Sequence, residues 1–383
     1  MIYRELGRTG LKVSQLGFGA MRLPMVGEGK EQKVDRELAI PMIHRALAGG
    51  VNYIDTAVGY CNDDSQRVIG EALKGWRDKV VVSTKNPNYG EDEKAWWKNL
   101  TDSLERLQVD CIDIYNHHGL RWKSWVENVE PRVRKWMYKA RDQGLIRHVC
   151  CSFHDSNESL MKIVDTGYPA SITLQYNMLD RQLAEGIARA HEKGIGVVVM
   201  GPVAGGRLGA PSDVLGSLVP GIERVPELAL RFVLSNPNVT IALSGMSTMQ
   251  HVEENLAVAS DAVSLTDDDK AAIDEHLQRM GEMVKLYCTG CGYCMPCEAA
   301  KINIPTAFEA YNYGRAYGLW DLAKRWYEGI HHGKEDRNQT AEACTECGKC
   351  EEKCPQNIPI RQQLKEAHEA LAPKDTEEPK QES

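Results

Sequence analysis

The feature that most constrains the fold is a repeated alternation between short apolar runs and longer segments whose apolar residues recur at helical spacing. The runs predict strands, and the longer segments predict helices. Parallel strands need such crossover helices, and eight strand-helix units are the number that closes a barrel. The expected strands are residues 16–20, 51–55, 80–85, 112–116, 149–152, 172–175, 196–200 and 240–244. The expected helices are residues 36–48, 65–73, 94–107, 129–143, 158–165, 183–193, 226–235 and 249–259.

The length of the chain leaves room for a smaller appendage beside that barrel. A single α/β barrel needs about 250 residues, and this chain has 383. We expect the barrel at residues 1–282, ending with a further helix at 267–280, and a second domain at 283–371. Residues 372–383 are charged and interrupted by proline, which predicts a disordered tail.

Three ionisable side chains fall where predicted strands end or shortly afterwards. Asp55 ends one expected strand, Tyr60 follows it by five residues, and Lys85 ends the next strand. Active sites of this fold lie at the carboxyl ends of the strands, so we expect these groups to share one site. A buried carboxylate is costly without a cation, which pairs Asp55 with Lys85. Taken alone, that pair is equally compatible with a structural ion pair.

The barrel part resembles the aldo-keto reductases. The stretches that carry the resemblance follow one another in family order: YRELGRTGLKVSQLGFGAMRLP, YIDTAVGY, VVVSTK, VDCIDIYNHHGL, LQYNMLDR, VVVMGPVAGGRL and SGMSTMQHVEEN. The resemblance implies a catalytic tetrad of Asp55, Tyr60, Lys85 and His118. The neighbouring His117 is expected to point to the other face of its strand, because side chains alternate along a strand.

The chemistry of carbonyl reduction agrees with those roles. A hydride must reach the carbon and a proton must reach the oxygen, so the site needs a donor that stays neutral until the oxygen becomes basic. Tyr60 is the expected donor. A free phenol has a pKa of about 10, and the Lys85 ammonium is expected to lower it by stabilising the phenolate. Asp55 would hold Lys85 charged, and His118 would orient the carbonyl or share the proton.

The same resemblance implies a nicotinamide cofactor, NADPH or NADH. Its expected contacts are Ser152 and Gln175 at the carboxamide, Met200 at the ring, Gly201, Gly206, Arg207 and Leu208 along the pyrophosphate, and His251, Glu254 and Asn255 toward the adenine end. Two residues depart from the family pattern. Met200 stands where many members stack an aromatic ring, and Phe153 follows Ser152 where an asparagine is common.

The choice between the two nucleotides stays open at this level. Residues 245–255 contain no lysine or arginine to hold the 2′-phosphate of NADPH, which removes the usual partner of that group. His251, at the expected arginine position, or Arg207 would have to serve instead. The alternative that neither nucleotide binds tightly is also open.

Eight of the twelve cysteines fall in two tight groups after residue 287. Cys288, Cys291, Cys294 and Cys297 are spaced C-x2-C-x2-C-x2-C, and Cys344, Cys347, Cys350 and Cys354 are spaced C-x2-C-x2-C-x3-C before Pro355. The second spacing is that of bacterial ferredoxins, in which three close thiolates bind one cluster and the fourth binds the other. Zinc also takes four thiolates, but its sites usually combine two C-x2-C pairs across a longer loop. We therefore predict two 4Fe-4S clusters.

We expect the ligands of these clusters to be crossed between the two groups. Cys288, Cys291 and Cys294 would share a cluster with Cys354, and Cys344, Cys347 and Cys350 would share the other with Cys297. The long spacer of helical composition between the groups resembles an α-helical ferredoxin module. The fold class is therefore α/β: a (β/α)8 TIM barrel with a C-terminal, mainly α-helical ferredoxin-like domain, as in the iron-sulfur branch of the aldo-keto reductases.

Charge and hydropathy exclude several other classes of protein. The net charge is −8, the pI is near 5.8 and no basic stripe occurs, so nucleic acid is not an expected partner. No stretch approaches the length of about 18 apolar residues that a membrane span needs. The N-terminus lacks the apolar core of a signal peptide. We expect a cytoplasmic protein, a compartment that keeps thiols reduced and favours metal binding over disulfides.

The function expected from these features is that of an NAD(P)H-dependent oxidoreductase acting on a small-molecule carbonyl substrate. The two clusters would serve electron transfer or structure. The alternative is an iron-sulfur electron-transfer protein that meets a redox partner protein, with the barrel acting as a binding or regulatory module, as in potassium-channel β-subunits. Nicotinamides deliver electron pairs and clusters pass single electrons, and the sequence shows no flavin site to convert between them. Substrate identity and oligomeric state are left open.

Overall fold

The fold is described from a computed structural model. The structure describes residues 1–90, 92–209, 211–260, 265–285, 288, 292, 294–332, 339–354 and 358–373. By contacts the chain divides into two compact units, Met1–Gly206 with Ala229–Leu265 and Arg207–Leu228 with Thr266–Ser383. The domain boundary expected near residue 282 does not coincide with this division and stays a prediction. The predicted disordered tail lies from residue 374 onward outside the described residues.

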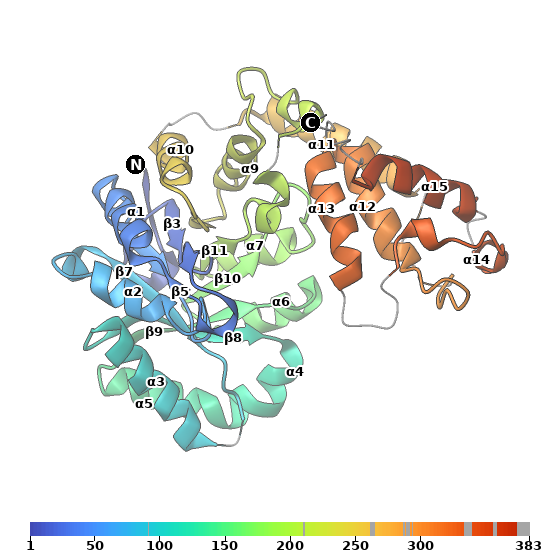
Figure 1. The fold of residues 1–383 in the computed structure, drawn as a ribbon. Coiled ribbons are helices and arrows are strands. Elements are labelled where there is room, and N and C mark those ends of the chain that lie inside the picture. Colours follow the sequence, from blue (N-terminus) through green and yellow to red (C-terminus); the bar gives the residue numbers. More distant parts are fainter. Residues whose placement is uncertain are drawn as a thin grey trace, which may run out of the picture. The chain divides into compact units, whose positions relative to one another are not determined.

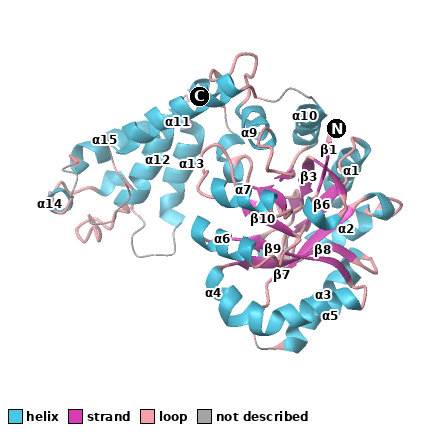
Figure 2. Cartoon of the chain, turned by 180° about the vertical axis from the view of Figure 1, so that it is seen from behind, coloured by secondary structure: helices cyan, strands magenta, loops and turns pink. Residues whose placement is uncertain are grey.

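Eight parallel strands form a closed barrel in the first unit, as the alternating pattern predicted (Figure 1). In chain order these strands are β3 (Leu16–Gly19), β6 (Tyr53–Asp55), β7 (Val81–Asn86), β8 (Ile112–Leu120), β9 (Ile146–Phe153), β10 (Ser171–Gln175), β11 (Gly196–Met200) and β12 (Ile241–Ser244). Each strand pairs with its neighbour in sequence, and β12 pairs with β3 to close the ring. Figure 2 shows these strands in magenta with cyan helices around them.

Helices connect successive strands, as parallel pairing requires. They are α1 (Arg36–Ala48), α2 (Ser65–Ala72), α3 (Glu93–Leu107), α4 (Trp122–Ser124), α5 (Arg134–Asp142), α6 (Asn157–Asp165), α7 (Ala184–Glu192), α8 (Asp213–Gly216), α9 (Val225–Leu234) and α10 (Met249–Ser260). Before the barrel, β1 (Tyr3–Glu5) and β2 (Lys12–Ser14) form an antiparallel hairpin. A second small hairpin pairs β4 (Met25–Val26) with β5 (Lys33–Val34).

Most elements match their predicted bounds to within two residues, but β9 begins three residues earlier, at Ile146, and α11 (Asp267–Lys285) continues five residues further. Two further differences lie at the end of the barrel that carries the site. The strand expected at 112–116 continues to Leu120 as β8. The helix expected at 129–143 begins earlier, with α4 and a π-helical segment η4 (Trp125–Val133) before α5. Pro131 lies inside η4, where its missing N–H cannot make the α-helical hydrogen bond. Wider π turns accommodate such interruptions.

The second unit is helical in its described part. Its longer helices are α11 (Asp267–Lys285), α12 (Ile304–Tyr317), α13 (Trp320–Glu328) and α15 (Ile360–Leu371), and α14 (Lys349–Glu352) is a short one. Phe308, Tyr327 and Leu364 are buried at its core, and Cys344, Cys350 and Cys354 pack against that core. The cysteines are therefore part of the packing of this unit.

Most of the loop between β11 and α9 belongs to the second unit, although in the sequence it lies between two strands of the barrel. The backbone carbonyl of Tyr317 accepts a hydrogen bond of 2.6 Å from the Ser212 hydroxyl. Gly318 has a φ of +64°, and a Cβ there would lie 2.9 Å from the same hydroxyl oxygen. Glycine therefore meets two requirements at this contact, a left-handed backbone and a close approach.

Among the described residues, no helix is both long and apolar enough to cross a membrane.

Candidate functional site

A buried ion pair lies where β6 and β7 end. The Lys85 ammonium donates hydrogen bonds to the Asp55 carboxylate at 2.5 Å and to the Thr56 carbonyl at 2.9 Å. The second oxygen of Asp55 accepts a 2.8 Å hydrogen bond from the Ser83 hydroxyl. Both charged side chains are nearly inaccessible to solvent. Burial acts to lower the pKa of Lys85, but Asp55 and Tyr60 outweigh it and the pKa is raised, so the ammonium stays charged.

The loop after β6 brings Tyr60 to this pair, and it does so in a strained conformation. Three consecutive residues after Tyr60, beginning with Cys61, have a positive φ of 53°, 54° and 66°. Such residues are held only where their surroundings fix them. Here the Asp63 carboxylate accepts a 2.9 Å hydrogen bond from the Gly59 amide and pairs with Arg106 at 3.1 Å. The loop therefore presents Tyr60 in a fixed position.

The Tyr60 ring lies over the Lys85 ammonium, with Nζ 4.8 Å from the ring centroid. Burial raises the pKa of Tyr60, and Lys85 opposes that rise by its charge and by a hydrogen bond. The sequence-based expectation that the Tyr60 pKa would be lowered is therefore wrong in its net direction. The reason is that removal from water disfavours the phenolate more than one cation, itself held by Asp55, can stabilise it. Tyr60 is a neutral phenol at neutral pH.

The two adjacent histidines of β8 point to different surroundings. The His118 ring meets the Tyr60 ring edge to face, with centroids 5.9 Å apart. His117 is buried and its Nε2 lies 3.0 Å from the Tyr168 hydroxyl. Burial lowers the pKa of His118 to about 4, with a further contribution from the charge of Lys85. His118 is therefore a neutral imidazole beside the phenol, and the structure brings all four residues of the expected tetrad together.

The burial of His117 predicts a pH dependence of stability. Burial lowers its pKa to about 3, so between pH 6.5 and 3 the unfolded chain binds a proton that the folded chain does not. Stability should then fall as the pH is lowered through this range, by about 1.4 kcal/mol per pH unit for each such histidine. His117→Asn should flatten the slope of unfolding free energy between pH 6.5 and 4.5, measured by urea titration. A slope equal to that of the unaltered protein would contradict this.

The residues expected at the nicotinamide lie at the ends of neighbouring strands. Gln175 and Met200 are register partners that end β10 and β11. A Cβ on Gly201 would lie 3.6 Å from the Gln175 side chain, so these three positions are adjacent. Ser152 is different, because its buried hydroxyl already accepts a 2.7 Å hydrogen bond from the Gly119 amide. Phe153 is buried and pairs with Leu120 of β8.

The remaining expected cofactor residues are more dispersed. Gly206 is exposed at the end of the first unit, whereas Arg207 and Leu208 belong to the second unit. Leu208 is fully buried, and the side chain of Arg207 lies outside the described residues. On α10, His251 and Glu254 are accessible, and the Asn255 amide donates a 2.9 Å hydrogen bond to the Ser244 hydroxyl at the end of β12.

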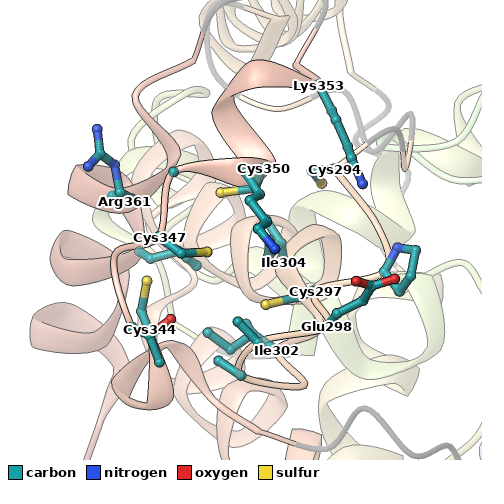
Figure 3. A pocket seen from close by; sticks show the side chains of 17 residues that line it. Cys294, Cys297, Glu298, Ile302, Ile304, Cys344, Cys347, Cys350, Lys353 and Arg361 are labelled. Carbon is teal, nitrogen blue, oxygen red and sulfur yellow. The ribbon is translucent and has the colours of Figure 1, made fainter.

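A pocket in the second unit collects cysteines from both sequence groups. Cys294 and Cys297 of the first group and Cys344, Cys347 and Cys350 of the second line it. Figure 3 shows the sulfurs of Cys297, Cys344, Cys347 and Cys350 facing a common space, with Cys294 set toward Lys353. Four thiolates around one space are the donor set of a 4Fe-4S cluster. The expected crossed set of Cys297 with Cys344, Cys347 and Cys350 lies within this lining and stays a prediction, because among the described residues no three His, Cys, Asp or Glu side chains are placed to hold a single metal ion.

The second expected ligand set is only partly described. Cys288 and Cys354 are half-buried and pack against the same core as the first set. Cys291 lies outside the described residues. The membership of this set therefore stays a prediction.

Two residues at the mouth of the barrel were not singled out from the sequence. Arg121 and His154 directly follow Leu120 and Phe153, which are register partners at the ends of β8 and β9. His154 lies within electrostatic reach of both Lys85 and His118. The expected strand ends at residues 116 and 152 left both residues out of the site. Only the observed length of β8 shows that they are neighbours.

The closed barrel of eight parallel strands, with Asp55, Tyr60, Lys85 and His118 gathered at its rim, is an α/β-barrel of the class that carries active sites at the carboxyl ends of its strands. The family model described as "Aldo/keto reductase family" matches residues 15–213 and 221–278. The chain belongs to the aldo/keto reductase family. The family model of a 4Fe-4S dicluster domain matches residues 287–359. This match confirms the ferredoxin-type region predicted from the cysteine spacing and implies two clusters.

Several known proteins are similar to the barrel part. L-galactose dehydrogenase from Arabidopsis thaliana is 28% identical over 70% of this chain and 91% of its own length. The NADH-specific methylglyoxal reductase of Escherichia coli is 27% identical over 70% of this chain and 96% of its own. The holo form of aldo-keto reductase AKR11C1 from Bacillus halodurans superposes with a TM-score of 0.60 at 30% identity, covering 72% of this chain and 96% of that one.

The crossed ligand sets can be tested by counting iron in paired cysteine variants. If Cys297 and Cys347 serve the same cluster, Cys297→Ala/Cys347→Ala should keep about four of eight irons, because the other cluster is untouched. The matched variant Cys294→Ala/Cys347→Ala should disrupt both clusters and approach zero iron. The measurement is iron and sulfide analysis of anaerobically purified protein. Near-zero iron in both variants would show uncrossed ligation, because each variant would then remove one ligand from each cluster.

Proposed function

We propose that this protein reduces a small-molecule carbonyl with NADPH or NADH, using Asp55, Tyr60, Lys85 and His118. The observation that carries the proposal is the Lys85 ammonium, held at 2.5 Å by Asp55 and 4.8 Å from the Tyr60 ring centroid. A structural ion pair would need no phenol beside it. Because the phenol is neutral and lies against a cation, it can lose a proton when a strongly basic oxygen forms next to it.

In this mechanism the protein residues handle the proton and a bound nicotinamide supplies the hydride to the carbonyl carbon. The Tyr60 hydroxyl donates its proton to the carbonyl oxygen as the C–H bond forms, which yields the alcohol. The Lys85 ammonium then stabilises the Tyr60 phenolate, and Asp55 keeps Lys85 protonated. His118 is neutral and can donate a hydrogen bond to the same oxygen, which orients the carbonyl and shares its developing charge.

The nicotinamide is proposed to lie over the ends of β9, β10 and β11. Gln175, Met200 and Gly201 are adjacent there. They supply a side-chain amide, a thioether and a backbone without a side chain. Ser152 accepts a hydrogen bond from the Gly119 amide and donates one to the His117 carbonyl, so donating to the carboxamide would require it to give up the bond to His117. The name of the Escherichia coli relative, an NADH-specific methylglyoxal reductase, supports a nicotinamide cofactor and a carbonyl substrate for this chain.

We propose the two clusters at the crossed cysteine sets, for electron transfer or structure. The four sulfurs that face one space in Figure 3 fit such a group. Cys347 is exposed, so one edge of that cluster would be open to a redox partner protein. When bound, a cluster accepts or donates one electron.

The proposed function is tested with anaerobically purified protein of intact iron content. NADH and NADPH are each titrated by fluorescence, and oxidation of the bound one is followed at 340 nm with a panel of aldehydes. Carbonyl-dependent oxidation supports the proposal. Tight nucleotide binding without turnover of any carbonyl would instead favour a barrel that binds or regulates, and cluster reduction by a partner protein would then become the activity to measure.

A further inference from the structure

The mouth of the barrel carries a guanidinium that the proposed hydride chemistry does not use. Arg121 is exposed and directly follows β8, the strand that carries His118. Among the described residues it makes no ion pair, although several exposed arginines of the barrel unit do, such as Arg45 with Glu253 at 2.7 Å. A guanidinium that forms no ion pair, beside a catalytic rim, is suited to bind an anionic ligand.

The position of Arg121 is set by the backbone around it. Leu120 of β8 is in register with Phe153 of β9, and the His154 amide donates a 3.1 Å hydrogen bond to the Leu120 carbonyl. Arg121 and His154 therefore leave the barrel from paired positions on adjacent strands. This places a guanidinium and an imidazole together at the mouth.

The nearby carboxylate of Asp155 accepts a hydrogen bond from a backbone amide on each of its two oxygens. It accepts a hydrogen bond of 3.0 Å from the Trp122 amide and one of 2.8 Å from the Ser156 amide. The hydrogen bond to Trp122 links the loop after β8 to the loop after β9. Asp155 therefore fixes the loop that contains Arg121. Asp155 also interacts with Arg121 through its charge, but no ion pair joins the two side chains in the described part of the chain, so the guanidinium N–H groups stay available for a ligand.

His154 extends this cationic edge toward the reacting groups. It is accessible at the mouth, and a Cβ on Gly119 would lie 3.7 Å from its ring. Burial, Arg121 and Lys85 together lower the pKa of His154, so at neutral pH it is uncharged and can donate one N–H. Lys85 is occupied by Asp55, which leaves Arg121 as the charge that a substrate anion would meet.

We propose that Arg121 and His154 bind a carboxylate of the substrate, so that the preferred substrate is a carbonyl compound with a carboxylate at some distance from the carbonyl. The proposal rests on the proposed carbonyl reduction. With the carbonyl oxygen at Tyr60 and His118, the carboxylate would lie roughly 5–10 Å away, because Arg121 is three residues beyond His118, just past the end of β8, and an extended chain rises about 3.3 Å per residue. A rigid aromatic aldehyde with a carboxylate opposite the carbonyl spans such a distance.

The test compares a matched pair of aldehydes, 4-carboxybenzaldehyde and its neutral methyl ester, in the full-length protein with its clusters. The unaltered protein should prefer the carboxylate in kcat/KM, and Arg121→Gln should reduce that preference by about tenfold, because hydrogen bonds to charged groups are the strong ones. Arg121→Lys should keep part of it, since the charge remains but the fork is lost. His154→Phe should reduce the preference by a smaller factor.

The matched control is Arg141→Gln, which removes an exposed arginine at the end of α5 just before β9 begins, on the opposite end of the barrel. It should leave both aldehydes unaffected. A second readout does not depend on turnover: binding of the product carboxylate, 4-(hydroxymethyl)benzoate, by calorimetry should weaken in Arg121→Gln and not in Arg141→Gln.

The outcomes separate this inference from the proposed function. Equal preference in the unaltered protein and in Arg121→Gln, with both aldehydes still reduced, overturns the carboxylate site and leaves carbonyl reduction intact. A raised KM for the nucleotide with an unchanged aldehyde preference also overturns it, because Arg121 would then serve the cofactor. If no aldehyde is reduced, the proposed function fails, and loss of benzoate binding in Arg121→Gln would still support the site.

Discussion

Tyr60→Phe protein should lose carbonyl reduction by about 10²–10⁴ in kcat, the factor that a positioned general acid supplies. The substitution removes only the hydroxyl, and the ring can keep its place over the Lys85 ammonium and against His118. Nucleotide binding should therefore persist. The measurement is steady-state turnover of an aldehyde beside fluorescence titration of NADH and NADPH.

The control removes a different phenol from the same barrel. Tyr138 lies on α5 and contacts Tyr168, Arg134 and Arg141 through its ring, so Tyr138→Phe should keep full activity. Undiminished turnover in Tyr60→Phe would remove Tyr60 from the role of proton donor. Loss of both turnover and nucleotide binding would indicate damage to the loop and would call for Tyr60→Trp or Tyr60→His as a second variant.

Lys85→Met should lower the free energy of unfolding by about 3–5 kcal/mol, because it leaves the Asp55 carboxylate buried without its cation. Asp55 is 4% exposed and Lys85 is 2% exposed, so water cannot replace the lost partner. The change should also abolish carbonyl reduction. Urea unfolding of the barrel, followed by circular dichroism, measures the first effect.

The double variant Asp55→Asn/Lys85→Met distinguishes the buried charge from ordinary packing loss. It should regain much of the stability, since no unpaired charge remains, while activity stays absent. The exposed pair Lys98–Asp102, at 2.6 Å on α3, is the matched control. Lys98→Met should change stability by no more than about 1 kcal/mol. If Lys85→Met behaved like Lys98→Met, the buried pair would not be a stabilising contact.

The architecture was predictable because it depends on patterns that repeat along the chain. Eight apolar runs and their helical connections predicted eight strands, and the structure has them in a closed parallel barrel. The cysteine spacing predicted a two-cluster ferredoxin region, and the 4Fe-4S dicluster match confirms its class. Both are local signals, since a strand or a C-x2-C repeat is defined within a few residues.

The electrostatics of the site were not predictable in the same way. The net pKa direction of Tyr60 depends on how much water its loop excludes, and three positive φ values after it determine how that loop folds. The contact between His117 and the Tyr168 hydroxyl likewise joins positions far apart in the chain. Burial and long-range pairing are properties of the whole fold, so no window of sequence contains them.

The sequence by itself therefore determined the barrel, the cluster-binding class and the residues at the strand ends, because periodicity and spacing suffice for them. Only the tertiary structure decided that burial raises the pKa of Tyr60 despite the nearby Lys85, that His117 meets the Tyr168 hydroxyl, and that Arg121 and His154 follow paired positions of β8 and β9. The physical reason is that the energy of a charge depends on its neighbours and on the water it has lost, and both are fixed by segments distant in the chain.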